Sequence, residues 1–265
     1  FRLQDPSQPG DPITSQLLRV MADDSAKEVR MAAISTVAPS KHAIRAILER
    51  VRDSSAEVRL HALGVLRDKV EMRWLSISQR VVLLEGALRD RTPSVAAACA
   101  DMLTGGWLRK GCNNDVLALL HALDAVARER VATERAAHEK VASMALDVLL
   151  QRDAETRKLV AAAAEKHWAE DAHERQPESA MCLAAHLSYL AAAAKDKRGG
   201  AGGVGDEAPE LPTICDALRH ASDACLAATS DKAVVSATCT ISQLARAAAK
   251  CELEEGGRMA LQTLT

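Results

Sequence analysis

Seven basic side chains between positions 69 and 110 are the residues whose type could support chemistry, namely the binding of phosphate groups. The stretch 19–110 carries 16 basic and 11 acidic residues, so it is positive, whereas the whole chain has a formal net charge of −2. Cations that share one groove bind a DNA backbone without reading its sequence. For each of them the alternative is an ordinary solvated surface charge. Our DNA-binding candidates are Lys69, Arg73, Arg80, Arg89, Arg91, Arg109 and Lys110.

Motifs for catalysis, metal binding and cofactor binding are missing from the sequence. It contains no HExxH, no Cys/His cluster, no GxSxG and no GxxxxGK[ST] motif. The glycine-rich stretch 199–205 superficially resembles a phosphate-binding loop, but it lacks a preceding strand and the Lys-Ser/Thr pair. We therefore predict no catalytic, cofactor-binding or metal-binding residues and no enzymatic activity.

The cysteines argue against a disulfide framework. Their number, seven, is odd, no pair has CxxC spacing, and most lie among Ala and Leu, where a free thiol acts as a small core residue. This usage is typical of a reducing compartment, the cytosol or the nucleus. We find no signal peptide and no apolar run long enough to span a bilayer. The chain starts at Phe1 rather than Met, so we expect a fragment of a longer protein.

The elements that must position the basic residues are helices. Aromatic residues make up 2% of a chain that is 48% hydrophobic, which suits closely packed helices better than strands. One pattern occurs three times: an apolar stretch, an Asp, and a Val five residues later that opens a second apolar stretch. The steps between the Asp residues are 29 and 37 residues, the size of a helix–turn–helix unit in HEAT and armadillo repeats. We predict an all-α fold, a HEAT-repeat α-solenoid of stacked helical hairpins.

The turn residues of the three copies predict a ladder of ion pairs. Each Asp side chain can close its turn with its oxygens, and an Arg six residues later can pair with the Asp of the neighbouring copy. The third copy has Ala instead of Arg, so the ladder should end there. The positions concerned are Asp24, Arg30, Asp53, Arg59, Asp90 and Ala96.

Two tryptophans lie near the basic candidates, Trp74 and Trp107. In a chain with so few aromatic residues they are large apolar anchors. We expect both to pack in the core between repeats, with a peptide-binding hot spot as the alternative.

Helical patterns continue to the end of the chain with one interruption. Further helices are predicted over 132–150, 154–169 and 177–195, and again from about 211 and over 232–249. Between them, the stretch 195–209 is charged and rich in glycine, which predicts a flexible loop. We therefore divide the chain into a first part of the solenoid (1–194), the loop (195–209) and continuing HEAT-type helices (210–265).

A family resemblance is carried by three linked motifs within Lys69–Val95. They are Lys-Val-x-Met-Arg, Ser-Ile-x-Gln-Arg and Leu-x-Asp-Arg-x-x-x-Val, in this order. This stretch closely resembles the condensin subunit family called CAP-G. Shorter matches are 106–108 and 119–124, with similar stretches at 3–13 and 253–258. The resemblance is strong over about 1–125 and thinner but collinear afterwards.

The resemblance implies a non-catalytic HEAT-repeat subunit of condensin that acts in mitotic chromosome condensation. Its partners would be a kleisin subunit and, through the complex, an SMC ATPase pair, which would perform the ATP hydrolysis. The solenoid and the kleisin segment threaded across it would hold double-stranded DNA independently of sequence. The resemblance implies the nucleus and mitotic chromosomes, and in part the cytoplasm, with no cofactor and no membrane.

Two other classes of function stay open. A HEAT-repeat scaffold without DNA binding would bind peptides, and charge reversal at Arg73 and Arg80 would leave its partner binding intact. An enzyme built on HEAT repeats would need a reactive Cys or acid in a pocket, and the sequence nominates none. A continuous basic trough across 69–110 favours DNA, whereas an apolar groove favours a peptide.

Overall fold

The computed structural model describes residues 4–5, 11–167, 176–196 and 211–249. Within these ranges every regular element is a helix. The chain divides into two compact units, 1–114 and 115–265, a division that the sequence analysis did not place. Each unit is described by itself.

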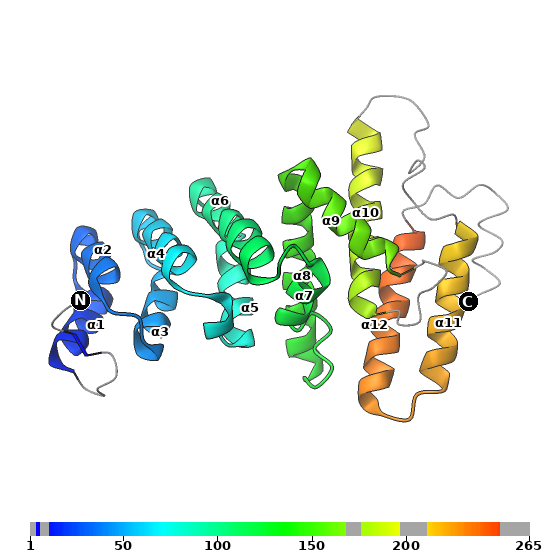
Figure 1. The fold of residues 1–265 in the computed structure, drawn as a ribbon, viewed down its shortest axis with the longest axis horizontal. Helices are drawn as coiled ribbons and strands as arrows, with labels where there is room; N and C mark the ends of the chain where they lie inside the picture. Colours follow the sequence, from blue (N-terminus) through cyan, green and yellow to red (C-terminus); the bar gives the residue numbers. More distant parts are fainter. Residues whose placement is uncertain (1–3, 6–10, 168–175, 197–210, 250–265) are drawn as a thin grey trace. The chain divides into compact units, whose positions relative to one another are not determined.

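Unit 1 contains three helical hairpins that lie side by side (Figure 1). The pairs are α1 (Pro12–Asp23) with α2 (Lys27–Thr36), α3 (Lys41–Arg50) with α4 (Ala56–Lys69), and α5 (Ile77–Ala87) with α6 (Pro93–Asp101). A 3-10 turn, η1 (Met72–Trp74), lies between α4 and α5, and α6 continues into a π-helical stretch, η2 (Met102–Gly111). The three Asp–Val turns of the sequence are the turns within these hairpins.

Local sequence signals explain where the helices of unit 1 begin. Asp11 accepts from the Thr14 N–H at 2.7 Å and caps α1, whose first residue is a proline. At the start of α5, Ser76 and Gln79 form a reciprocal capping box, which satisfies two backbone N–H groups that a helix end would leave open. Proline at the first position of α6 costs no hydrogen bond there.

Apolar side chains between the two helix layers form the core of unit 1. One layer is α1, α3 and α5, and the other is α2, α4 and α6 (Figure 1). Each hairpin needs its neighbours to cover its apolar stripe, because two helices alone leave part of it in water. Fully buried side chains come from all three hairpins and include Met21, Ile34, Leu63, Leu66 and Leu84.

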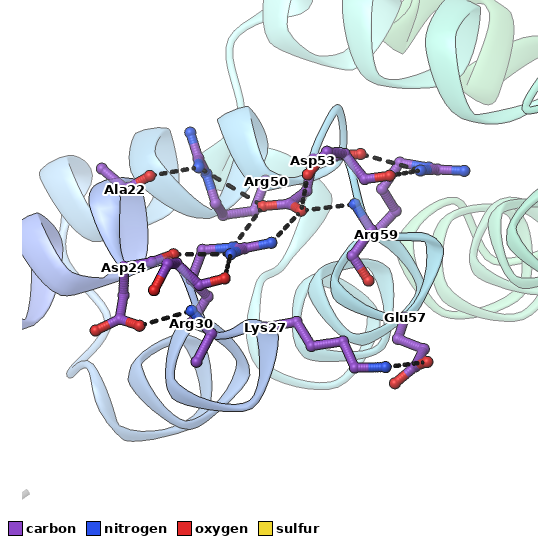
Figure 2. Close-up of polar contacts among 12 residues, drawn as sticks. Ala22, Asp24, Lys27, Arg30, Arg50, Asp53, Glu57 and Arg59 are labelled. Atoms are coloured by element: carbon purple, nitrogen blue, oxygen red, sulfur yellow. Dashed lines mark hydrogen bonds and ion pairs between the residues drawn. The ribbon is translucent and has the colours of Figure 1, made fainter.

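Two buried arginines link neighbouring hairpins of unit 1 (Figure 2). Arg30 donates to both carboxylate oxygens of Asp53, at 3.0 and 2.7 Å, and to the Asp24 carbonyl at 2.8 Å. Arg59 repeats this arrangement with the carboxylate of Asp90, at 2.7 and 2.8 Å, and with the Asp53 carbonyl at 3.0 Å. Each Asp also accepts from the backbone N–H two residues further on. Side chains thus join each turn to the next, up to the third hairpin, where an alanine stands in place of the arginine.

This Arg–Asp ladder predicts that unit 1 loses stability in acid. Burial would raise the pKa of Asp53, but hydrogen bonds from Arg30 and the Ser55 N–H, with the charges of Arg30 and Arg50, hold it below its usual 3.8. The pKa of Asp90 is lowered as well, chiefly by the hydrogen bonds from Arg59. A carboxyl with a depressed folded pKa stabilises the fold above its unfolded pKa, and this contribution is lost as pH falls through the folded value.

We therefore expect the Tm, followed by circular dichroism, to fall steeply below about pH 4. The double variant Asp53→Asn, Asp90→Asn should have a lower Tm at pH 7 and a flatter pH dependence below pH 4. If the Tm of this variant fell below pH 4 as steeply as that of the wild type, other carboxyls would govern the acid unfolding.

Unit 2 is built around α10 (Pro177–Asp196), which packs against four other helices. These are α7 (Val116–Ala122), α8 (Ala132–Arg152), α9 (Ala154–Glu165) and α12 (Asp231–Ala248); α11 (Leu211–Leu226) packs against α12. At the start of α10 the buried Glu178 carboxylate lies 3.3 Å from both Arg128 and His121. Within the described part of the chain, no helix combines the length and apolarity that a membrane crossing requires.

Two of the predicted features fall on residues that the structure does not describe. The predicted loop 195–209 is one of them, apart from its first two residues, which still belong to α10. The resembling stretch at 253–258 also lies outside the described residues.

Candidate nucleic-acid interface

A hollow of about 560 Å³ in unit 1 collects residues from the end of α4, the connection to α5, and η2. We call it the basic pocket. It brings together basic, acidic and aromatic side chains that are up to 43 positions apart in the sequence (67 to 110). The lining residues are Arg67, Asp68, Lys69, Val70, Glu71, Met72, Arg73, Trp74, Gly106, Trp107, Lys110 and Gly111.

Two buried residues hold the exposed rim of the basic pocket in place. Val70 ends α4 and Leu75 precedes α5, and their exposed fractions are 8% and 3%. Between these two anchors the backbone makes the short turn η1, in which the Trp74 N–H donates to the Glu71 carbonyl at 2.9 Å. Arg73 and Trp74 therefore project outward from a connection that is fixed at both ends.

The π-helical stretch η2 forms the opposite wall of the basic pocket. Its Gly106 brings bare backbone to the hollow, and a Cβ there would stand 3.9 Å from Cγ of Arg67, so the stem of that arginine lies directly over it. Trp107 is 3% exposed and closes the wall from the core side. π-Helices are rare, and single-turn π-bulges within α-helices are frequent at functional sites.

Positive charge exceeds negative charge in the basic pocket, with four cations against two carboxylates. Arg67 donates to Asp68 at 2.8 Å, and Arg73 pairs with Glu71 at 2.6 Å. The pKa of Asp68 is lowered, chiefly by the hydrogen bond from Arg67, and the charges of Lys110 and Lys69 add to this effect. These pairs are solvent-exposed and so contribute little stability, which leaves both arginines available to phosphate.

Of the seven predicted DNA-binding residues, the basic pocket collects Lys69, Arg73 and Lys110. Lys69 also donates to the Ser35 carbonyl at 2.9 Å, which directs its stem along the first hairpin. The sequence left open whether the seven residues share one groove, and in the structure three of them gather in the basic pocket. Three other candidates, Arg89, Arg91 and Arg109, are exposed but line no part of it.

The seventh candidate, Arg80, lies inward from the surface. It is half-buried in α5, and its Nε donates to the Met72 carbonyl at 3.1 Å. Burial lowers its pKa. Its guanidinium therefore fixes α5 to η1, the turn that carries Arg73 and Trp74.

Two residues of the basic pocket depart from the sequence analysis. Arg67 was not among the candidates, although it lies one helical position ahead of Asp68 in the same charged run. Trp74 was expected in the core, which is wrong, because its exposed fraction is 48%. The expectation for Trp107 is confirmed by its 3% exposure. The tryptophans differ because Trp74 falls in the turn η1 and Trp107 on the inner side of η2.

A second hollow of unit 1, about 520 Å³ in volume, separates α3 from α5. We call it the α3–α5 groove, and its floor is apolar. The lining residues are Arg45, Leu48, Glu49, Val51, Arg52, Ser76, Ser78, Gln79, Val82, Leu83 and Gly86. Unit 1 therefore carries both types of surface that the sequence analysis distinguished, a basic one and an apolar one.

The thiols of unit 1 and unit 2 behave as core residues. Cys99, Cys112, Cys182 and Cys215 are buried and form no disulfide. Burial raises the pKa of Cys99 to about 12, so this thiol stays protonated and is a poor nucleophile. Among the described residues, no three His, Cys, Asp or Glu side chains gather as a metal site would require.

Comparison with known proteins gives relatives over part of the chain, and no family model matches it. Condensin complex subunit 3 of Homo sapiens is 42% identical over 123 residues, and the Xenopus laevis protein of the same name is 41% identical over 123. The chain is similar to condensin complex subunit 3. The Schizosaccharomyces pombe relative is 38% identical over 109 residues. These matches cover 41–46% of this chain and 12% of each relative, so the chain spans a small part of their length.

A solved structure shows the fold. The crystal structure of the S. pombe condensin Cnd3–Cnd2 subcomplex matches 98% of this chain and 33% of its own, with a TM-score of 0.78 and 23% sequence identity. The predicted all-α HEAT-repeat fold is thereby confirmed.

Proposed function

We propose that this chain is part of a non-catalytic HEAT-repeat subunit of condensin that binds a kleisin subunit and double-stranded DNA independently of sequence. The observation that carries the proposal is the basic pocket, in which three of the predicted DNA-binding residues meet a fourth cation. Relatives named condensin complex subunit 3 supply the biological context. The matching S. pombe structure is a subcomplex of Cnd3 with Cnd2, which supports a Cnd2-type kleisin as the partner. Within the complex, ATP hydrolysis would belong to the SMC subunits, and the site of action would be the chromosome.

Phosphate contacts would dominate DNA binding at the basic pocket. Lys69, Arg73 and Lys110 offer donors to phosphate oxygens, and the exposed Trp74 offers a flat apolar face beside them. These groups do not address base edges, so the interaction would be independent of sequence. Three to four neutralised phosphates give a slope of log K against log salt of roughly −3.

The test compares two triple charge reversals in the complex of the chain with its Cnd2-type partner. We expect Lys69→Glu, Arg73→Glu, Lys110→Glu to weaken binding of a 30-base-pair duplex more than about 10-fold at low salt and to flatten the salt slope by about three. Fluorescence anisotropy across a salt series measures both quantities.

The matched control is Arg89→Glu, Arg91→Glu, Arg109→Glu, which has the same change of charge outside the basic pocket. At about 0.15 M salt we expect its affinity to stay within about threefold of the wild type, because exposed charges more than about 8 Å from a bound phosphate are screened at that ionic strength. Equal losses in the two variants would mean that the field of the whole segment, and not this pocket, attracts DNA.

The second candidate function is a protein-interaction scaffold without DNA binding. The α3–α5 groove favours it, since an apolar floor suits a peptide. In that case charge reversal at Arg73 would change neither duplex affinity nor partner affinity. Duplex binding that is lost in the basic-pocket variant while partner binding is kept separates the two functions.

A further inference from the structure

The α3–α5 groove is bordered by one face of each helix. On α3, Arg45 and Leu48 are spaced at i and i+3 and so share a face, and Arg52 follows in the turn after the helix. On α5, Ser78, Val82 and Gly86 are spaced at i, i+4 and i+8. Such faces are about 10–12 Å long at 1.5 Å per residue. Three or four residues of an extended chain, at about 3.3 Å each, fit along them.

The floor of the groove leaves apolar surface in water. Val51 and Leu83 are buried beneath it, at 5% and 3% exposure, whereas Val82 above them is 46% exposed. Covering this surface with another apolar side chain is favourable, because each square ångström of apolar surface removed from water lowers the free energy of the complex. The volume of about 520 Å³ is in the range of pockets that hold a ligand or a few side chains, roughly 300–1,000 Å³.

Charge in the groove is confined to the α3 side. Glu49 is the carboxylate of the lining, and it lies 3.8 Å from Arg45. Arg52 reaches toward α5, because its Nε would be in van der Waals contact, at 3.7 Å, with a Cβ placed on Gly86. The α5 side offers the hydroxyl of Ser78 and the amide of Gln79. The occupant that complements this wall is apolar over the floor and acidic opposite Arg52.

The groove is connected to the basic pocket through α5. On the α5 side its first lining residue, Ser76, is the N-cap of α5, and two positions earlier Trp74 lines the basic pocket. Arg80 ties α5 to η1 through the Met72 carbonyl. An occupant of the groove would therefore contact the same helix that positions the rim of the basic pocket.

We propose that the α3–α5 groove binds an extended segment of the partner subunit that places apolar side chains on Val82 and a carboxylate against Arg52. The identity of the partner rests on the proposed function; the chemistry of the segment rests on the groove. Bound there, the segment lies beside the basic pocket and helps to hold α5 in place.

A photo-crosslinking experiment locates the occupant. Benzoylphenylalanine replaces Val82 in one version of the full chain and Val29 in another, and each is mixed with the Cnd2-type subunit of the same organism. Val29 is the matched control, because it is 41% exposed, lies on α2 and does not line the groove. We expect a crosslink from position 82 to one short partner segment that contains Asp or Glu, and none from position 29. A crosslink from position 82 to a second copy of this chain, or equal crosslinking from both positions, overturns the proposal.

Affinity measurements test the two parts of the chemistry separately. We expect Val82→Asp to weaken partner binding at least 10-fold and Val29→Asp to stay within twofold, both with an unchanged circular dichroism spectrum. Arg52→Glu should weaken binding by a smaller factor, and reversing the acidic residue found in the crosslinked segment to Arg should restore it. Partner binding that is unchanged in Val82→Asp overturns the groove as the docking site and leaves the proposed function standing. If the wild-type chain itself fails to bind the partner, the proposed function fails instead.

Discussion

Replacing Asp53 with alanine is expected to lower the free energy of unfolding of unit 1 by about 3–5 kcal/mol, because it leaves a buried guanidinium without its carboxylate. The side chains of Asp53 and Arg30 are only 3% and 10% exposed, so water cannot replace the lost partner. Asp53 also accepts from the Ser55 N–H at 2.9 Å, so the substitution removes the cap of the turn as well. Urea denaturation, with hydrogen exchange of the α2 and α4 amides, measures the loss.

The matched control for this substitution is Asp68→Ala, which removes a carboxylate that is 60% exposed and paired with Arg67. Exposed pairs contribute about 0–1 kcal/mol, so we expect a change of that size. The double replacement Arg30→Met, Asp53→Leu should cost less than Asp53→Ala alone, because no buried charge is left over. If Asp53→Ala were no more costly than Asp68→Ala, the ladder would contribute little to the stacking of the hairpins.

Replacing Trp107 with alanine is the second substitution with a large expected effect, a loss of about 3–5 kcal/mol. Trp107 is 3% exposed, so its removal leaves a cavity behind the wall of the basic pocket. Trp74→Ala is its matched control, since the same side chain lines the same pocket at 48% exposure. A side chain that is already half in water should cost about 1 kcal/mol or less.

The two tryptophans should separate stability from binding. We expect Trp74→Ala to lower the Tm by only a few degrees and to weaken duplex binding severalfold, because the indole is the apolar face beside the cations. Trp107→Ala should lower the Tm whether or not DNA is present. Equal losses of stability in the two variants would contradict the difference in burial on which this prediction depends.

Repeat chemistry made much of the fold predictable. The Asp of each turn reveals the hairpins because the turn needs a side-chain acceptor. The Val five residues later is an inward apolar residue in the second and third copies, Val58 and Val95, whereas Val29 of the first copy is 41% exposed. Helices predicted at 132–150, 154–169 and 177–195 are observed at 132–152, 154–165 and 177–196. Local rules suffice for these elements, since caps, prolines and apolar periodicity all act within a few residues.

The basic pocket was less predictable because it depends on where the chain returns in space. Nothing local indicates the π-helical stretch η2, whose residue Lys110 lines the basic pocket together with Lys69. In the sequence Arg73 and Arg80 are equivalent. In the structure Arg73 is exposed on the turn η1, whereas Arg80 lies in α5 and donates to the Met72 carbonyl of that turn. A charge count over the segment detects the excess of cations but cannot separate the residues at the surface from the one that braces the backbone.

The ladder also explains how unit 1 tolerates repeats of unequal length. The interval from Asp24 to Asp53 is eight residues shorter than the interval from Asp53 to Asp90, yet both Arg–Asp pairs form. The surplus is taken up mostly at the end of α4, with 14 residues against 10 in α2, and in the connection that follows it. Those added residues are the ones that line one side of the basic pocket. An insertion that is held at both ends by Arg–Asp pairs can vary in sequence without disturbing the stack of hairpins. A new binding surface can therefore arise on this scaffold without a change in how the hairpins align.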